Sequence, residues 1–139
     1  MKQYRLVIFL AALGLVLFAG LTVAQVQKGK TRPLETKVWM KTVNGPHCSA
    51  IGKMLKAGIT DDKQWEEAKV HAEMLNEAGH VLMADGRCPD AAWADGAKQL
   101  RENSDALLKD IAAKDATAGQ ADFQKLLGAC KTCHAAHKK

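Results

Sequence analysis

The spacing of apolar residues constrains this chain more than any other feature. After the first two dozen residues, apolar side chains recur at three- and four-residue steps in four segments, and no stretch shows the two-residue alternation of a half-buried strand. The segments cover about residues 34–57, 62–84 and 91–113, and a last one that starts near 117–121 and reaches the C-terminus. Only a few residues connect them, so consecutive helices must run antiparallel. The sequence therefore predicts an all-α fold, an antiparallel up-down-up-down four-helix bundle.

The first helical segment is interrupted by Gly45-Pro46. A proline inside a helix removes one hydrogen bond and costs about 3 kcal/mol, so the helix should kink there or begin anew. Three- and four-residue steps place a set of residues on one stripe that spans the interruption: Met40, Val43, His47, Ala50, Met54 and Ala57. Because this phase continues past Pro46, we expect one kinked helix.

The other helices have signals at their ends and apolar faces along their length. Gly58 is a natural helix end, and Thr60 or Asp61 should cap the second helix. The second helix has Trp65, Ala68, Ala72, Leu75, Gly79 and Leu82 on one face. After a turn at residues 85–90, the third has Trp93, Ala97, Leu100, Ala106 or Leu107, and Ile111. The last has Phe123, Leu127, Cys130, His134 and His137 in phase.

The N-terminus has the pattern of a secretory signal. Lys2 and Arg5 precede an apolar stretch at residues 6–23, and small residues end at Ala24, which suits cleavage there. The alternative is a retained membrane anchor, because 18 positions lie near the lower limit of roughly 17 to 20 residues for a span. We therefore expect a signal peptide at 1–24, a flexible leader at 25–33 and one four-helix domain at 34–139. The protein should be periplasmic or otherwise exported.

The charge pattern argues against nucleic-acid binding. The formal net charge of +5 includes Lys2 and Arg5, so the chain after residue 24 carries +3. Basic and acidic residues are interspersed through 61–114 as on solvated helix faces, whereas nucleic-acid binders cluster Lys and Arg with stacking aromatics. A mildly basic surface could still steer docking with an acidic redox partner.

Two of the four cysteines stand in the motif Cys130-Lys131-Thr132-Cys133-His134. Covalent haem attachment needs two thiols that reach neighbouring edges of the porphyrin and an imidazole beneath the iron. Helical positions three apart share a face, so Cys130 and Cys133 can supply the thioethers and His134 the proximal iron ligand. A zinc site would need a second ligand pair, a thioredoxin-like pair would need a βαβ setting, and a disulfide inside a helix would be strained. The motif therefore predicts one covalent haem c.

The chain from about Trp93 to Lys138 resembles the class II cytochromes c, the cytochrome c′ family. The likeness rests on Trp93 at the start of the third helix, on Phe123 and Gly128 before the motif, and on the motif close to the C-terminus. It implies an exported four-helix bundle that holds haem between its helices, that is often a homodimer through its first two helices, and that carries electrons or binds small gases. His137 and Lys138 depart from the aromatic residue and arginine common in the family, and we expect His137 only to flank the site.

The sixth iron ligand decides the function, and in this family it comes from the first helix. Met40 resembles the methionine of the low-spin His/Met branch, although a methionine on an apolar stripe is often only packing. His47 is the rival ligand, and Asn44 would line an open distal pocket instead. With Met40 bound, the protein is an electron carrier that docks with redox partner proteins. With an open site it binds nitric oxide or carbon monoxide. Peroxidase-type catalysis would need distal acid and base groups, for which only His47 offers itself.

Cys48 and Cys88 are left to pair with each other. An oxidising compartment permits a disulfide, and a bridge between these positions would contribute roughly 4 kcal/mol in the chain-entropy model. It would tie the first helix to the turn before the third. Two independent buried thiols are the alternative.

Overall fold

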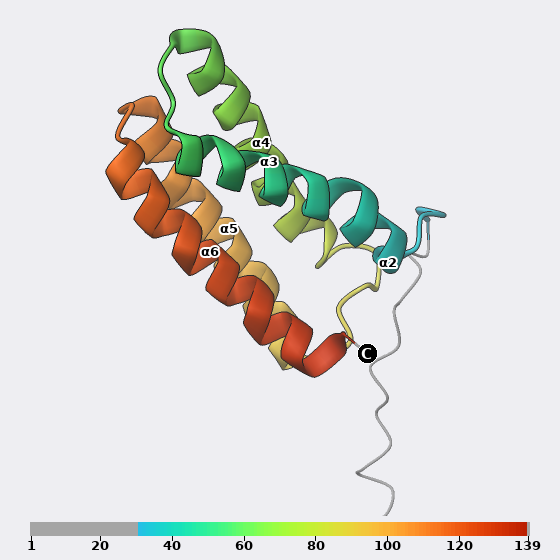
Figure 1. The fold of residues 1–139 in the computed structure, drawn as a ribbon. Coiled ribbons are helices and arrows are strands. Elements are labelled where there is room, and N and C mark those ends of the chain that lie inside the picture. The colour runs from blue at the N-terminus through green and yellow to red at the C-terminus, as the bar shows by residue number, and fades with distance from the viewer. Residues whose placement is uncertain (1–30, 139) are drawn as a thin grey trace, which may run out of the picture.

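The computed structural model describes residues 31–138, and all of its regular structure is helical. The first helix consists of α2 (Thr36–Trp39), the π-helical segment η1 (Met40–Asn44) and α3 (Gly45–Ala57). It is followed by α4 (Asp62–Val81), α5 (Ala91–Ala112) and α6 (Ala116–His137) (Figure 1). The prediction of an all-helical bundle is confirmed for this part of the chain. The predicted signal peptide at 1–24, most of the leader and Lys139 lie outside the described residues.

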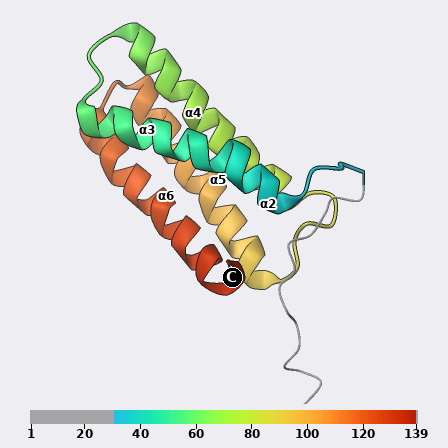
Figure 2. The same ribbon diagram turned by 45° about the vertical axis from the view of Figure 1, so that its right-hand side comes forward.

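The helices form a bundle in which consecutive helices are neighbours. α3 packs on α4, α4 on α5 and α5 on α6, while α6 also returns to contact α3. Figures 1 and 2 show that consecutive helices run in opposite directions. The end of α3 lies close to the start of α6, whereas α2 and η1 diverge from the last turns of α6 and have no close backbone contact with it. The bundle is thus closed at one end and splayed at the other.

A π-helical turn immediately before Gly45-Pro46 lets the first helix continue through the proline. The Gly45 N–H donates to the carbonyl of Met40, five residues earlier, so this turn contains one residue more than an α-helical turn. Our expectation of an unbroken apolar phase was therefore wrong. Past the π turn the buried residues are Ile51 and Leu55, each one position later than the predicted Ala50 and Met54, which are only half-buried.

The helix ends and core of the other elements follow the sequence signals closely. Asp61 caps α4 by accepting a hydrogen bond from the Gln64 N–H at 2.8 Å, and Gly58 ends α3 with a φ of 88°. Asp90 and Asp115 cap α5 and α6 in the same way. The predicted face of α4 is confirmed, and on α5 Leu107 is buried, whereas Ala106 is half-buried. On α6 the buried residues are Gly119, Phe123, Leu126, Ala129 and Cys133. Of the predicted row, only Phe123 is buried, whereas Leu127, Cys130 and His137 are half-buried and His134 is exposed.

Two glycines mark where α6 approaches its neighbours most closely. A Cβ built on Gly96 of α5 would lie 2.8 Å from the Cβ of Cys133, and one on Gly52 of α3 would lie 2.9 Å from the ring of Phe123. Only glycine allows these approaches, since real Cβ atoms do not come so near. Because Gly96 has no side chain, Cys133, the second motif cysteine, packs directly against the backbone of α5. Within residues 31–138 no helix is both long and apolar enough to cross a membrane.

Candidate functional site

The motif residues lie in the last turns of α6, at the splayed end of the bundle. Cys133 is buried against Gly96, Cys130 is half-buried and packs against the core, and His134 is exposed. Together with Leu127, the residues Cys130 and His134 form a row on the side of α6 that turns towards the first helix. The row is covered where α3 is near and uncovered where α2 and η1 diverge. Because the first helix diverges from α6 here, His134 is exposed although the adjacent Cys133 is buried.

Both motif thiols are held in the protonated form. Burial, together with the nearby Cys48 and Cys133 thiols, raises the pKa of Cys130 to about 11. Burial and the carboxylate of Asp90 raise the pKa of Cys133. Reactive redox cysteines have lowered pKa values, because the thiolate is the nucleophile. The environment thus disfavours a thiolate redox pair and leaves two thiols on one side of a helix.

The His134 imidazole is biased towards its neutral form. Although the residue is exposed overall, partial burial of the ring and the charge of Lys138 lower the pKa of His134 below its usual range. Neutral imidazole is the form that binds iron or another transition metal. His134 is therefore suited to act as a metal ligand at neutral pH.

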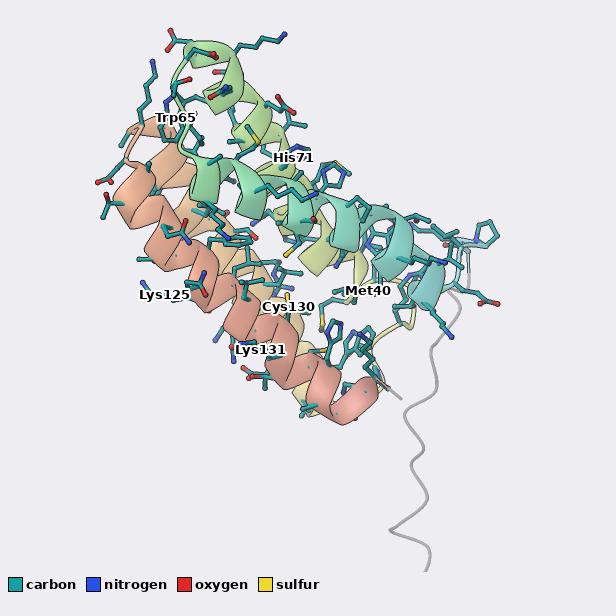
Figure 3. All side chains as sticks on the ribbon, in the orientation of Figure 1. Met40, Trp65, His71, Lys125, Cys130 and Lys131 are labelled. Atoms are coloured by element: carbon teal, nitrogen blue, oxygen red, sulfur yellow. The ribbon has the colours of Figure 1, made fainter. Side chains whose placement is uncertain are left out.

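Met40 lies on the opposite side of the splay. It belongs to η1 and is half-buried, packing against the edge of the core (Figure 3). The figure places Met40 and Cys130 in the region between the two diverging helices. Neighbouring Trp39 and Asn44 are also half-buried, and the Trp39 Nε1 and Asn44 Oδ1 atoms are buried without a hydrogen-bond partner. This part of the first helix thus offers a thioether and two unpaired polar groups.

His137 does more than flank the motif. Its side chain is only 6% exposed and meets Trp93 edge-on, with ring centroids 5.2 Å apart. Its Nε2 lies 3.4 Å from Asp90 Oδ1, but the geometry is not that of a hydrogen bond, and both ring nitrogens lack a partner. Trp93 in turn donates from Nε1 to the Leu82 carbonyl at 2.8 Å. These contacts join the end of α6 to the beginning of α5 and the end of α4.

His47 does not face the motif. Its Nδ1 lies 2.8 Å from Nδ1 of His71 on α4, and the ring centroids are 5.0 Å apart. The extra residue of the π turn rotates His47 away from the side on which Met40 lies. Burial and the charge of His71 lower the pKa of His47. In the structure, the contact partner of the His47 ring is thus His71 and not a motif residue.

The expected bridge between Cys48 and Cys88 is not formed, because all four cysteines are free thiols. Cys48, on α3, lies close enough to Cys130 to contribute to the raised pKa of the Cys130 thiol. Cys88, in the α4–α5 loop, instead directs its thiol to the carbonyl of Asp90 at 3.3 Å. The structure therefore does not support the predicted Cys48–Cys88 disulfide, because the two thiols contact different residues.

Sequence reasoning missed Arg87, which lies in the α4–α5 loop. Its side chain is buried, at 2% exposed, and its Nη1 donates to Thr36 Oγ1 on α2 at 3.0 Å. Its Nε has no hydrogen-bond partner. No sequence signal distinguishes this arginine from one at the surface, because a turn with Asp, Gly and Pro is normally solvated.

The unpaired polar atoms indicate that this end of the bundle fits a bound group. Of the six buried side-chain N and O atoms without a partner in the described part of the chain, five lie here: Trp39 Nε1, Asn44 Oδ1, Arg87 Nε and both ring nitrogens of His137. Leaving such an atom unpaired costs about 1–3 kcal/mol, so polar groups of this kind normally have partners. Two thiols, an imidazole and a thioether in the same region form the donor set expected for covalent haem.

Other places in the structure do not bring predicted site residues together. A hollow of about 400 Å³ between α4 and α5 is lined by Val70, Glu73, Met74, Asn76, Glu77 and Leu108, none of them a predicted site residue. Among residues 31–138, no group of three or more His, Cys, Asp or Glu side chains is placed to hold a metal ion.

Comparisons with protein-family models, with curated proteins and with solved structures gave no match.

Proposed function

We propose that the protein is an exported c-type cytochrome with one covalent haem and that it transfers electrons between partner proteins. Cys130 and Cys133 would form the thioether bonds, and His134 would bind the iron on the proximal side. The observation that carries the proposal is the row of motif residues at the splayed end of the bundle, turned towards the side on which Met40 lies. Haem would supply a one-electron iron couple, while the protein supplies ligands, burial and a docking surface.

Met40 is the proposed sixth ligand. It lies on the π-helical turn, and π turns occur frequently at functional sites because the extra residue re-aims side chains. Thioether ligation suits an electron carrier since it raises the reduction potential. The contact between His47 and His71 on α4 supports Met40 over His47 as the ligand.

The charges around the splayed end suit docking with acidic redox partners. The first helix, residues 36–57, contains no acidic residue and four exposed lysines, of which Lys37 and Lys41 lie at the splayed end. The end of α6 adds the exposed Lys131 and Lys138. By contrast, α4 carries more acidic than basic residues. An acidic partner would therefore be steered to the side where the haem edge would lie.

Homodimer formation through the first two helices is a further part of the proposal. Val38 on α2 and Val70 on α4 are large apolar residues that remain exposed, at 39% and 52%. They would provide apolar contacts between two copies. Export, and the alternative of anchoring by a retained N-terminal segment, depend on residues outside the described range.

A five-coordinate protein that binds nitric oxide or carbon monoxide is the second candidate. The buried, unpaired Asn44 Oδ1 beside Met40 favours it, because a polar group could line a distal pocket if Met40 only packs. The two functions differ in one property, which is whether a protein group occupies the distal position.

An absorption spectrum of the purified, reduced protein with and without carbon monoxide tests the proposal. A low-spin haem spectrum that the gas leaves unchanged supports the carrier, and a high-spin spectrum that changes at once supports the gas-binding protein. Met40→Ala should convert the first spectrum into the second. The matched control is Met54→Ala, since Met54 is also half-buried on the first helix and packs against the core. Colourless protein from a host that attaches haem would refute both functions.

A further inference from the structure

Arg87 is a buried cation without a carboxylate partner in the described residues. It is 2% exposed, its Nη1 donates to a neutral hydroxyl, that of Thr36, and its Nε is unpaired. The hydrogen bond from the Arg32 N–H is the largest cause that lowers the pKa of Asp85, two residues earlier, and the charge of Arg87 adds to it, but Asp85 and Arg87 form no ion pair among the described residues. The Asp85 carboxylate instead accepts hydrogen bonds from the N–H groups of Thr31 and Arg32.

Such an arrangement is unfavourable unless something completes it. Taking a charged group out of water without a counterion is costly, and buried charges are normally paired or hydrogen-bonded throughout. A guanidinium presents its donors in a planar fork that matches a carboxylate. The chemistry of the buried group thus calls for an anion, and a carboxylate fits it best.

The position of Arg87 connects it to the proposed haem site. Thr36 precedes Met40 by one helical turn, so the two lie on the same face of the first helix. Three residues after Arg87, Asp90 caps α5 and lies 3.4 Å from His137 at the end of α6. The loop that carries Arg87 therefore spans the splay between α2 and the C-terminal turns of α6 (Figure 1).

We propose that Arg87 binds a propionate carboxylate of the haem. The inference rests on the proposed function, because it assigns a partner to a second part of the same prosthetic group. The two cysteines would hold the haem through its vinyl substituents, and His134 and Met40 would hold the iron, whereas Arg87 would hold a propionate. A fixed positive charge at this edge stabilises the reduced, less positive haem over the oxidised form, so Arg87 also raises the reduction potential.

Four variants of the haem-loaded protein test the proposal. Arg87→Met removes the charge and suits a buried position, and Arg87→Gln is a second neutral variant for the case that Met does not accumulate. Thr36→Val removes the hydroxyl that accepts the Arg87 bond but keeps the cation. Arg101→Gln is the matched control, since Arg101 also donates from Nη1, in its case to the Gly79 carbonyl between α4 and α5.

The readouts are the midpoint potential and the propionate carboxylate bands in the redox-induced infrared difference spectrum. Either neutral Arg87 variant should lower the potential and shift the carboxylate bands, while Thr36→Val and Arg101→Gln should stay close to wild type in both. Wild-type values of both quantities in a folded, haem-loaded Arg87 variant would overturn the proposal. Equal changes in Thr36→Val and Arg87→Met would overturn it as well, because Arg87 would then act only by holding α2. Wild-type protein without haem would instead refute the proposed function, and this inference with it.

Discussion

Replacing Gly96 with alanine should destabilise the protein, although alanine is the better helix former. Gly96 lies inside α5, where the new Cβ would be 2.8 Å from the Cβ of Cys133 and 3.4 Å from its Sγ. Both helices are long and packed along one another, so the contact can be relieved only by moving backbone. Gly96→Ala should therefore push α6 away from α5 at the second motif cysteine.

The magnitude follows from two opposing effects. Gly→Ala in a helix interior gains about 1 kcal/mol from helix propensity. Overpacking at a close contact costs about 1–3 kcal/mol. The net effect of Gly96→Ala is a loss of about 0–2 kcal/mol in the free energy of unfolding. Gly128→Ala is the control, because Gly128 is also inside a helix, on α6, and its added Cβ would have nothing within 4 Å.

Urea denaturation of the two variants, followed by far-UV circular dichroism, measures the difference. Gly128→Ala should be more stable than wild type by about 1 kcal/mol, the same propensity gain. The gap between the variants should thus be about 1–3 kcal/mol, the overpacking cost alone. If Gly96→Ala gained as much stability as Gly128→Ala, the close approach of α5 and α6 at Cys133 would be refuted.

Three further predictions concern the core, a helix cap and the histidine pair. Leu107→Ala, at a fully buried position, should lower the free energy of unfolding by about 2–5 kcal/mol in urea denaturation, and a loss below 1 kcal/mol would contradict its place in the core. Asp61→Ala should cost about 1 kcal/mol, since it leaves the Gln64 N–H unpaired, whereas Asp61→Asn should retain most of the stability. The lowered pKa of His47 means that its contribution to stability is complete above the unfolded-state pKa, near 6.5, and is lost as the pH falls through the lower folded-state value. His71→Gln removes one cause of that shift, so melting temperatures between pH 7.5 and 5 should fall less steeply than in wild type; an unchanged slope would exclude the charge interaction.

Local signals in the sequence determined most of the helical frame. The 3.6-residue spacing, Gly58 and the cap at Asp61 placed the elements within a few residues of their observed bounds, because helix hydrogen bonds and caps depend on nearby residues. The apolar face of α4 was also correct. The position of Cys130, Cys133 and His134 on the last helix follows from the same spacing, while their role as haem ligands stays a prediction.

The tertiary structure decided what depends on contacts between distant segments. The π turn before Pro46 shifted the later part of the first helix by one residue, so that His47 pairs with His71 on α4. Helix periodicity assumes a constant number of residues per turn, and one inserted residue rotates everything after it.

The same limit applies to the thiols and to the buried arginine. Cys48 lies near Cys130 and is not bonded to Cys88, and Arg87 is buried and bonded to Thr36 on α2 although its loop has the composition of a solvated turn. Residue spacing fixes which side chains share a face of one helix. The divergence of α2 from α6, which leaves His134 exposed, depends on how whole helices pack, and that information is not local.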